Sequence, residues 1–176
     1  MSYAVALACA AVVASLWAAP DLDGVAGAAL ACLMLAIAVS DWRRYRVPDR
    51  LNALALALRG FDILIAPQGS RGEAALDATV RMAAAFAAFY LFRAAYAALR
   101  GREGLGLGDV KLAAVAGAWV EWRMLPWVVE AAAVCGLALA IARRRRGGLR
   151  ADTRLPFAVG FAPAIWLGWW LERVGF

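Results

Sequence analysis

Seven long apolar runs follow one another along this chain, and only short polar segments separate them. A helix needs about 20 apolar residues to cross a bilayer, and within lipid it satisfies its own backbone hydrogen bonds. The run at 110–123 is short for a span, so we expect that helix to be tilted or half-buried. The pattern predicts helices at about 3–19, 24–40, 51–66, 74–99, 110–123, 125–142 and 156–172.

The composition indicates a membrane protein. Hydrophobic residues make up 65% of the 176 residues, and the mean hydropathy is +0.68. A water-soluble domain of this length could not bury so much apolar surface, so lipid must solvate part of it. We therefore predict an all-α membrane protein, a polytopic bundle of about six to seven transmembrane helices in a single domain over 1–176. The first run lacks the basic segment that starts a signal peptide, so we expect a retained helix.

The positive charges are concentrated in a few loops. The net charge is +6, and arginines gather at 43–50, 100–102 and 143–154, whereas the acidic turn at 20–24 has none. Under the positive-inside rule these basic loops face the cytoplasm, which places the N-terminus there as well. We interpret "RRRR" at 143–146 as such a loop, so the lipid bilayer is an expected partner and nucleic acid is not.

The missing residue types limit the chemistry. The chain contains no histidine, which excludes Ser-His-Asp and Cys-His catalysis and metalloproteases with an HExxH helix. The cysteines form no CxxC pair, so neither a zinc site nor a disulfide framework is expected. We interpret Cys9, Cys32 and Cys135 as packing residues, and we predict no metal or cofactor. Any catalysis must use carboxylates, hydroxyls or the single lysine, Lys111.

Ionisable residues inside the apolar runs are spaced as ion pairs. Asp77 and Arg81 are four positions apart, and Arg59 and Asp62 are three apart, so each pair lies on one helix face. Because an unpaired charge within a membrane is costly, we predict that the partners neutralise each other.

Two aspartates stand at the ends of predicted helices. Asp41 follows the second run, in "AIAVSDWRRYRVPDRLN", and Asp109 precedes the fifth, in "GLGLGDVKL". The predicted topology puts both at the cytoplasmic edge of the membrane, where neighbouring helices could bring them together. Structural roles are the alternative, because aspartate is a preferred helix N-cap, which suits Asp109, and Asp41 precedes a group of arginines.

A close pair of carboxylates is able to hydrolyse an amide bond. One carboxylate accepts a proton from water, and the other donates a proton to the carbonyl oxygen or to the leaving amine. Like charges at short distance resist double ionisation, so such a pair shares a proton and titrates as a unit. This chemistry requires neither a metal nor histidine, which fits the composition.

The glycines before Asp109 have an expected role of their own. Without a Cβ atom, the loop at 104–108 can adopt unusual backbone angles and allow another chain to approach closely. A peptide must be extended for its amide to be attacked, and a glycine loop could hold such a strand by backbone hydrogen bonds. Gly106 and Gly108 are therefore candidate substrate-binding residues.

Three stretches together resemble the type IV prepilin peptidases, the GxGD membrane aspartyl proteases that process pilin and archaellin precursors. "DWRRYRVPDRLN" resembles the motif around the first aspartate of that family, and "EGLGLGDVKLAAVAG" resembles the motif around the second. "LPFAVGFAPAIWLG" resembles the Pro-Phe or Pro-Tyr motif that opens the last helix. Order and spacing agree over about residues 30–170.

The resemblance implies a catalytic dyad of Asp41 and Asp109 in a GxGD aspartyl protease fold. It implies a six-helix core at 24–176 after an extra helix at 1–23. It also implies cleavage of the short basic leader peptide of type IV pilin-like precursors at the cytoplasmic face of the inner membrane, with the pilus assembly machinery as a further candidate partner. Substrate-binding or loop residues are then Gly106, Gly108, Lys111, Pro156 and Phe157.

Departures from the family pattern bear on the activity. Bifunctional members also methylate the new N-terminus and carry an insertion with paired CxxC motifs, which this chain lacks, so methylation is not expected. The short members found with tight-adherence pili, or preflagellin peptidases, are more similar. Outside the enzyme class, the alternative is a non-catalytic membrane scaffold or a small carrier in pilus assembly, which would tolerate substitution of both aspartates.

Two smaller hypotheses concern charged residues in the basic loops. Glu103, Asp49 and Asp152 are expected to attract the basic leader, with ordinary solvation as the alternative. Lys111 is expected either to hold a lipid phosphate or to bias the ionisation of the dyad.

Overall fold

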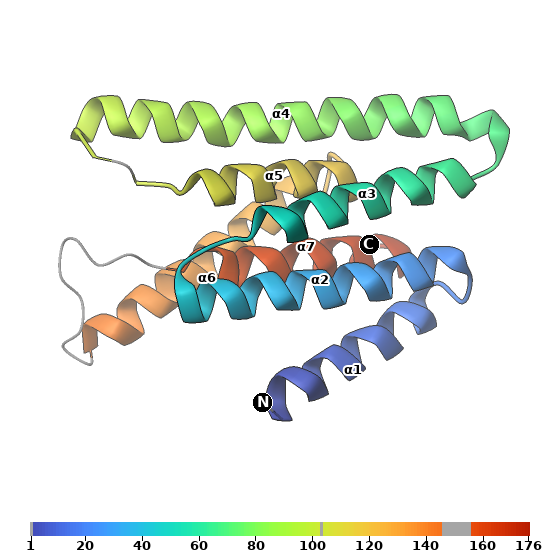
Figure 1. Ribbon diagram of the computed structural model, residues 1–176, viewed down its shortest axis with the longest axis horizontal. Helices are drawn as coiled ribbons and strands as arrows, with labels where there is room; N and C mark the ends of the chain where they lie inside the picture. Colours follow the sequence, from blue (N-terminus) through green and yellow to red (C-terminus); the bar gives the residue numbers. More distant parts are fainter. Residues whose placement is uncertain (1, 103, 146–155) are drawn as a thin grey trace.

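The computed structural model describes residues 2–102, 104–145 and 156–176, which contain seven helices (Figure 1). This confirms the all-α prediction, and each apolar run corresponds to one helix. The helices are α1 (Ser2–Ala18), α2 (Leu22–Arg44), α3 (Asp49–Ile65), α4 (Gln68–Arg100), α5 (Leu107–Trp119), α6 (Leu125–Arg145) and α7 (Ala158–Arg173).

Helix ends differ from the predicted ends where the first or last turn is polar. Helix α4 begins at Gln68 rather than near 74, because Pro67 stands at its N-cap and the first two turns are polar. Helix α2 continues to Arg44 rather than ending at 40. Hydropathy alone does not register polar turns of this kind, so it places both boundaries inside the helix.

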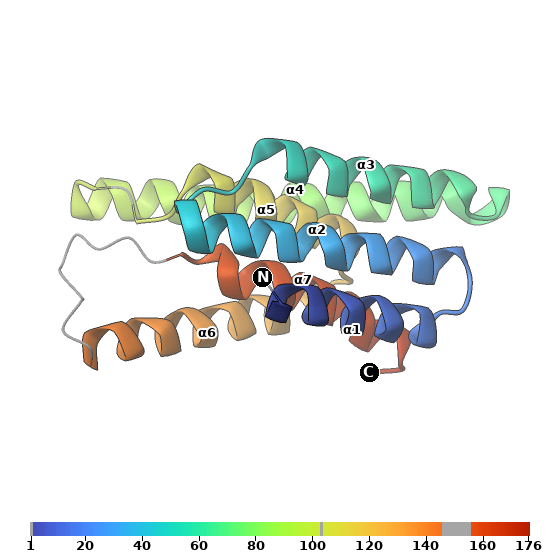
Figure 2. The same ribbon diagram turned by 60° about the horizontal axis from the view of Figure 1, so that its bottom comes forward.

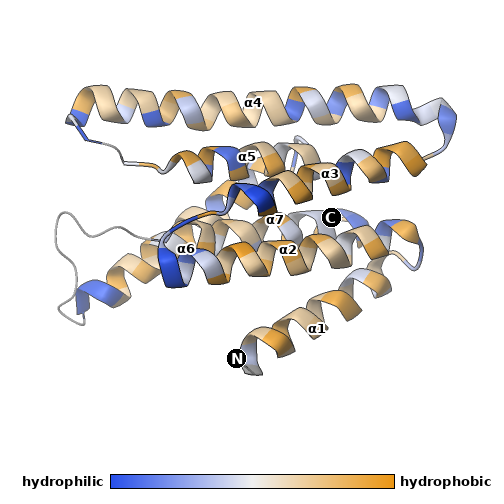
Figure 3. Ribbon diagram, viewed as in Figure 1, coloured by the Kyte–Doolittle hydropathy of each residue, from blue (hydrophilic) through white to orange (hydrophobic). Residues whose placement is uncertain are grey.

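Three helices are long and apolar enough to cross a membrane by length and composition: α2, α4 and α6. The other four helices of the described chain have 17, 17, 13 and 16 residues. Many apolar side chains of α4 and α6 are exposed on the surface, as Leu99 (84% exposed) and Trp127 (66% exposed) illustrate. An exposed apolar surface of this kind fits a lipid environment. Apolar residues predominate along most of the helices (Figure 3).

The helices pack in layers with α5 and α7 inside. Helix α4 lies along α5, and α3 also packs on α5. On the other side α7 lies between α2 and α6, and α1 packs against α2 (Figure 2). The side chains of α5 are buried from Leu112 to Trp119. This short helix is therefore shielded from lipid by its neighbours, as its short apolar run predicts.

Two arginines donate hydrogen bonds to the last carbonyls of α5. The last carbonyls of a helix have no partner within the helix, and a helix that ends inside a membrane protein needs donors from elsewhere. Arg81 donates from Nε to the carbonyl of Gly117 at 3.1 Å, and Arg59 donates to the carbonyl of Ala118 at 3.1 Å. The charges of both arginines are balanced by the two predicted ion pairs, Arg59–Asp62 and Asp77–Arg81, which are confirmed.

The first helix is bonded to the last. Trp166 on α7 donates from its indole nitrogen to the hydroxyl of Ser15 at 3.0 Å, and Trp170 donates to the carbonyl of Ala14 at 3.1 Å. Arg173 near the end of α7 forms an ion pair with Asp23 in the first turn of α2. These polar contacts attach α1 and the start of α2 to one face of α7.

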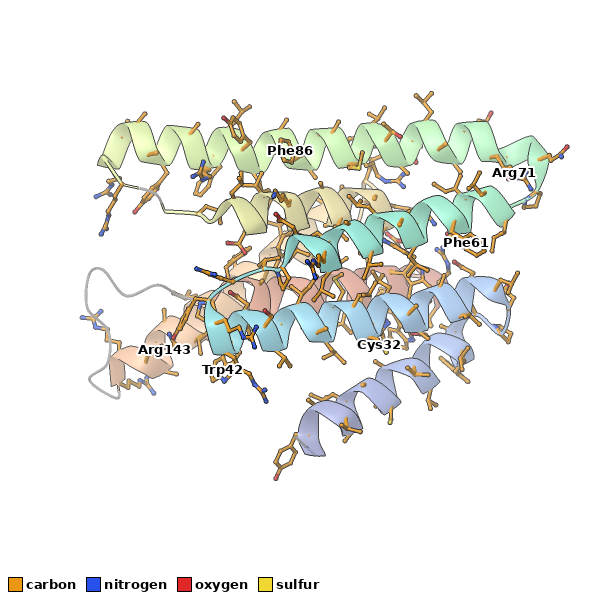
Figure 4. The ribbon with its side chains drawn as sticks, viewed as in Figure 1. Cys32, Trp42, Phe61, Arg71, Phe86 and Arg143 are labelled. Carbon is orange, nitrogen blue, oxygen red and sulfur yellow. The ribbon has the colours of Figure 1, made fainter. Side chains whose placement is uncertain are left out.

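The cysteines do not pack in the core, so that interpretation is wrong. Cys9, Cys32 and Cys135 are all free and exposed on the surfaces of their helices. Figure 4 shows Cys32 on the outer side of α2. An apolar run contains both core-facing and lipid-facing positions, and its hydropathy does not distinguish them.

Candidate active site

Asp41 lies in the last turn of α2, where it is only 5% exposed. The helix ends just beyond it, because Tyr45 adopts a left-handed conformation (φ 52°) and its N–H donates to the Asp41 carbonyl at 2.9 Å. The chain therefore leaves the helix one turn after the carboxylate, which remains inside the bundle.

The N-terminus of α7 is directed at the Asp41 carboxylate. The backbone N–H groups of Ala158 and Val159 interact with this carboxylate as hydrogen-bond donors. Such N–H groups have no partner within their own helix and favour a negative charge. Among the described residues, Oδ2 of Asp41 is buried without a hydrogen-bond partner. One carboxylate oxygen is thus left for another group.

Pro156 and Phe157 fix the position of the N-terminus of α7. Pro156 is fully buried immediately before α7, and Phe157 occupies the N-cap position. The Phe157 ring packs on Phe161 with 5.2 Å between the ring centroids, and Phe161 stacks on Phe89 of α4. The structure therefore gives the Pro-Phe motif a role in holding the start of α7 next to the Asp41 carboxylate. Direct substrate binding by these two residues stays a prediction.

Asp109 occupies the first turn of α5 and is half-buried. The N-cap of this helix is Gly106, so the N-cap position proposed for Asp109 as an alternative is wrong. The Asp109 N–H donates to the Gly106 carbonyl at 3.1 Å, and the Asp109 carboxylate interacts with the Gly106 N–H in return. This reciprocal pairing resembles a capping box and orients the side chain of Asp109.

The structure brings the two aspartates together. Asp41 comes from the end of α2 and Asp109 from the start of α5, and both lie at the same end of the bundle. Their carboxylates are close enough to interact electrostatically. A pair of interacting carboxylates, one buried and one half-buried, is the arrangement that proton sharing and acid–base chemistry on an amide require.

The glycines before Asp109 matter for the space they leave. Among the described glycines of the 101–108 loop only Gly101 has a positive φ, so the expected unusual angles at 104–108 are not found. A Cβ atom on Gly108 would lie 2.9 Å from the Cβ of Val47, and one on Gly106 would lie 3.1 Å from an Asp109 carboxylate oxygen. Gly108 thus lets the loop after Asp41 approach the start of α5.

Lys111 connects the same two segments. Its Nζ lies 2.8 Å from Oδ1 of Asp49, and the two side chains are 40% and 69% exposed. This ion pair joins α5 to the start of α3. The predicted effects of Lys111 on the dyad or on lipid phosphate stay predictions, as does attraction of the leader by Asp49. Glu103 and Asp152 lie outside the described residues.

Some residues of this region escaped the sequence analysis. Arg93 of α4 donates from Nε to the carbonyl of Leu105 at 3.0 Å, which anchors the glycine loop. Its position as a charge inside an apolar run could have indicated it. Arg143 at the end of α6 stacks on Trp42 and Tyr45 next to Asp41, each at 5.7 Å, and Figure 4 labels the Arg143–Trp42 pair. This cation–π contact has no sequence signal.

Other polar clusters lie away from the dyad. A pocket of about 380 Å³ at the far end of α5 is lined by the paired arginines and by Trp119, Trp122 and Glu172. Within the part of the chain that the structure describes, no group of three or more Cys, Asp or Glu side chains could hold a metal ion.

Comparison with known proteins decides the family. Residues 28–141 match the type IV leader peptidase family, and this range includes both aspartates. This chain belongs to that family. The predicted resemblance is confirmed, and no solved structure gives a significant match.

Several curated members of the family are similar to this chain. A prepilin leader peptidase/N-methyltransferase of Burkholderia pseudomallei (strain 1026b) is 36% identical over 157 residues, which cover 84% of this chain and 49% of that protein. A protein of the same name from Pectobacterium carotovorum subsp. carotovorum is 35% identical over 132 residues, covering 74% of this chain and 45% of that protein. This chain therefore spans about half the length of these two relatives. The Escherichia coli leader peptidase HopD is 32% identical over 142 residues, which are 80% of this chain and 88% of HopD.

Proposed function

We propose that this protein is a membrane aspartyl endopeptidase that removes the short basic leader peptide of type IV pilin-like precursors. The observation that carries the proposal is the placement of Asp41 and Asp109 at one end of the bundle, close enough for their carboxylates to interact electrostatically. Membership of the leader peptidase family and the names of the relatives support the reaction and the class of substrate.

The dyad would act by acid–base catalysis. One ionised carboxylate takes a proton from water as the water oxygen attacks the scissile carbonyl carbon. The other carboxyl group, which is protonated, donates its proton to the carbonyl oxygen, giving a tetrahedral intermediate. The intermediate collapses as the C–N bond breaks and a proton passes to the leaving amine. The new carboxylic acid and amine are released, and the dyad again holds a single proton.

We further propose that the dyad faces the cytoplasm across the inner membrane. Arginines at the dyad end outnumber the acids there, with four between 43 and 50 alone. At the opposite end each of four arginines has a carboxylate partner, in the pairs Arg59–Asp62, Arg81–Asp77, Arg123–Glu121 and Arg173–Asp23. An excess of basic residues favours the cytoplasmic side. The leader of a newly made precursor would meet the dyad on that side.

The test is cleavage of a co-expressed type IV pilin-like precursor, followed by gel shift and mass spectrometry of the product. Wild type is expected to shorten the precursor, and Asp41→Asn and Asp109→Asn are each expected to lower the rate at least about 100-fold, because each removes one half of the acid–base pair. Asp21→Asn is the matched control, since it changes an exposed aspartate at the far end and asparagine preserves its N-cap function.

Membrane levels of all four proteins must be equal for the comparison to hold. Equal cleavage by wild type and both dyad variants would refute the dyad. No cleavage by wild type of a precursor that HopD processes would favour the scaffold alternative.

A further inference from the structure

Asn52 in the first turn of α3 is a buried amide without a partner. The residue is only 3% exposed, and neither Oδ1 nor Nδ2 has a hydrogen-bond partner among the described residues. Buried polar side chains are nearly always hydrogen-bonded, because leaving them unpaired opposes folding. An apolar residue of the same size would fit this core position at lower cost, so the amide requires an explanation.

The face of α3 that carries Asn52 points at α5. Asp49, Asn52 and Ala55 are three residues apart and share one helix face. Asp49 accepts from Lys111 at 2.8 Å, and the carbonyl of Ala55 accepts from the indole nitrogen of Trp119 at 2.9 Å. Asn52 lies between these two contacts, so its side chain is directed at α5 between Lys111 and Trp119, on the helix that carries Asp109 in its first turn.

Asn52 is also level with Asp41. Helices α2 and α3 pack side by side and run in opposite directions, joined by the short link at 45–48. Asp41 lies in the last turn before this link and Asn52 in the first turn after it. Val47 within the link lies against Gly108 at the start of α5. The buried unpartnered groups of this end, Oδ2 of Asp41 and the Asn52 amide, thus come from adjacent turns around the dyad.

We propose that the Asn52 carboxamide binds the backbone of the substrate peptide beside the scissile bond. A carboxamide offers one acceptor and a donor, which match the N–H and the C=O of an extended peptide. The amide would then be unpaired only while the site is empty. This inference rests on the function proposed above and adds to it a substrate-binding residue that contacts no specific side chain.

Two variants of equal shape separate a hydrogen-bonding role from a packing role. Threonine carries a hydroxyl, which can donate and accept, in place of one of the two methyl groups of valine. We expect Asn52→Thr to retain cleavage within about threefold of wild type, and Asn52→Val to lose about tenfold in kcat/KM, mostly through a higher KM, because one or two hydrogen bonds to substrate are lost.

Thermal unfolding in detergent provides a readout that does not depend on cleavage. If the amide is reserved for a ligand, the empty Asn52→Val protein should be at least as stable as Asn52→Thr, since valine leaves no polar group unpaired. Trp169→Phe removes another buried unpartnered donor, at the far end of α7, and should leave KM unchanged.

Three results would overturn the proposal. The first is cleavage by Asn52→Val with the kcat/KM of wild type. The second is a clearly lower midpoint of thermal unfolding for Asn52→Val than for Asn52→Thr, which would reveal that the polar group at position 52 has a hydrogen-bond partner within the protein. The third is an equal rise in KM for Trp169→Phe. If wild type cleaves no precursor, the proposed function fails and the thermal comparison alone decides whether Asn52 is a ligand-binding amide.

Discussion

At the scale of single residues, Gly108 is the position where the two aspartate segments touch. In Gly108→Ala the new Cβ would lie 2.9 Å from the Cβ of Val47, so one segment must move. Because alanine favours a helix more than glycine does, the only cost is steric, and we expect cleavage to fall by about tenfold or more. Adding Val47→Gly removes the colliding atom and should restore part of the rate. Full activity of Gly108→Ala alone would show that the close contact is unimportant.

Lys111 tests electrostatic control of the dyad. Lys111→Met removes a positive charge and leaves Asp49 without its partner, which disfavours further negative charge nearby. The pH profile of cleavage should therefore move to higher pH. In the double variant Lys111→Met with Asp49→Asn both charges are gone, and the profile should return towards that of wild type. Superimposable profiles for all three proteins would exclude this role.

Residue patterns in the sequence were sufficient to single out Asp41 and Asp109 as candidates, because each stands at the boundary between an apolar run and a basic or glycine-rich segment. They were insufficient for the groups around them. The N–H groups of Ala158 and Val159 reach Asp41 from a helix far away in the chain, and backbone atoms have no sequence signature. Asn52 is visible in the sequence, but its lack of partners becomes apparent only once its neighbours are placed.

At the scale of elements, α5 depends on its neighbours for its C-terminal hydrogen bonds. Arg81→Met leaves the carbonyl of Gly117 and the carboxylate of Asp77 without this partner, so the free energy of unfolding should fall by about 2 kcal/mol. Thermal or denaturant unfolding in detergent measures the change. Arg71→Met is the control, because Arg71 also donates from α4 to a carbonyl, that of Ala66, but near an exposed loop. An equal effect of both substitutions would contradict the buried capping role.

The elements themselves were largely predictable because the apolar runs match the helices one to one. The sequence did not predict which faces of the helices meet, because the runs are apolar on every side. Close packing of α4 on α5 at Gly117, where a Cβ atom would collide with the Arg81 carbonyl oxygen, follows from the shape of both helices. The same limitation explains why three exposed cysteines were interpreted as packing residues.

At the scale of the whole molecule, orientation in the membrane is open to direct measurement. In a variant without Cys9, Cys32 and Cys135, a single cysteine is placed at Arg100 or at Gly69, which lie at opposite ends of α4. Both sites are exposed, and a side chain at Gly69 meets no atom within 4 Å. A membrane-impermeant thiol reagent should label position 69 in intact spheroplasts and position 100 only after permeabilisation. The reverse pattern would place the dyad outside the cytoplasm.

The bonds between α1 and α7 set an order for biosynthesis. A chain that enters the membrane from its N-terminus makes α1 first and α7 last, yet Ser15 and Ala14 receive their indole partners only from Trp166 and Trp170. The start of α7 also supplies the amides that reach Asp41. The ribosome must therefore have made α7 before either end of the bundle can close. Until then the nascent protein carries both aspartates but lacks an assembled site, which delays any peptidase activity until α7 is in place.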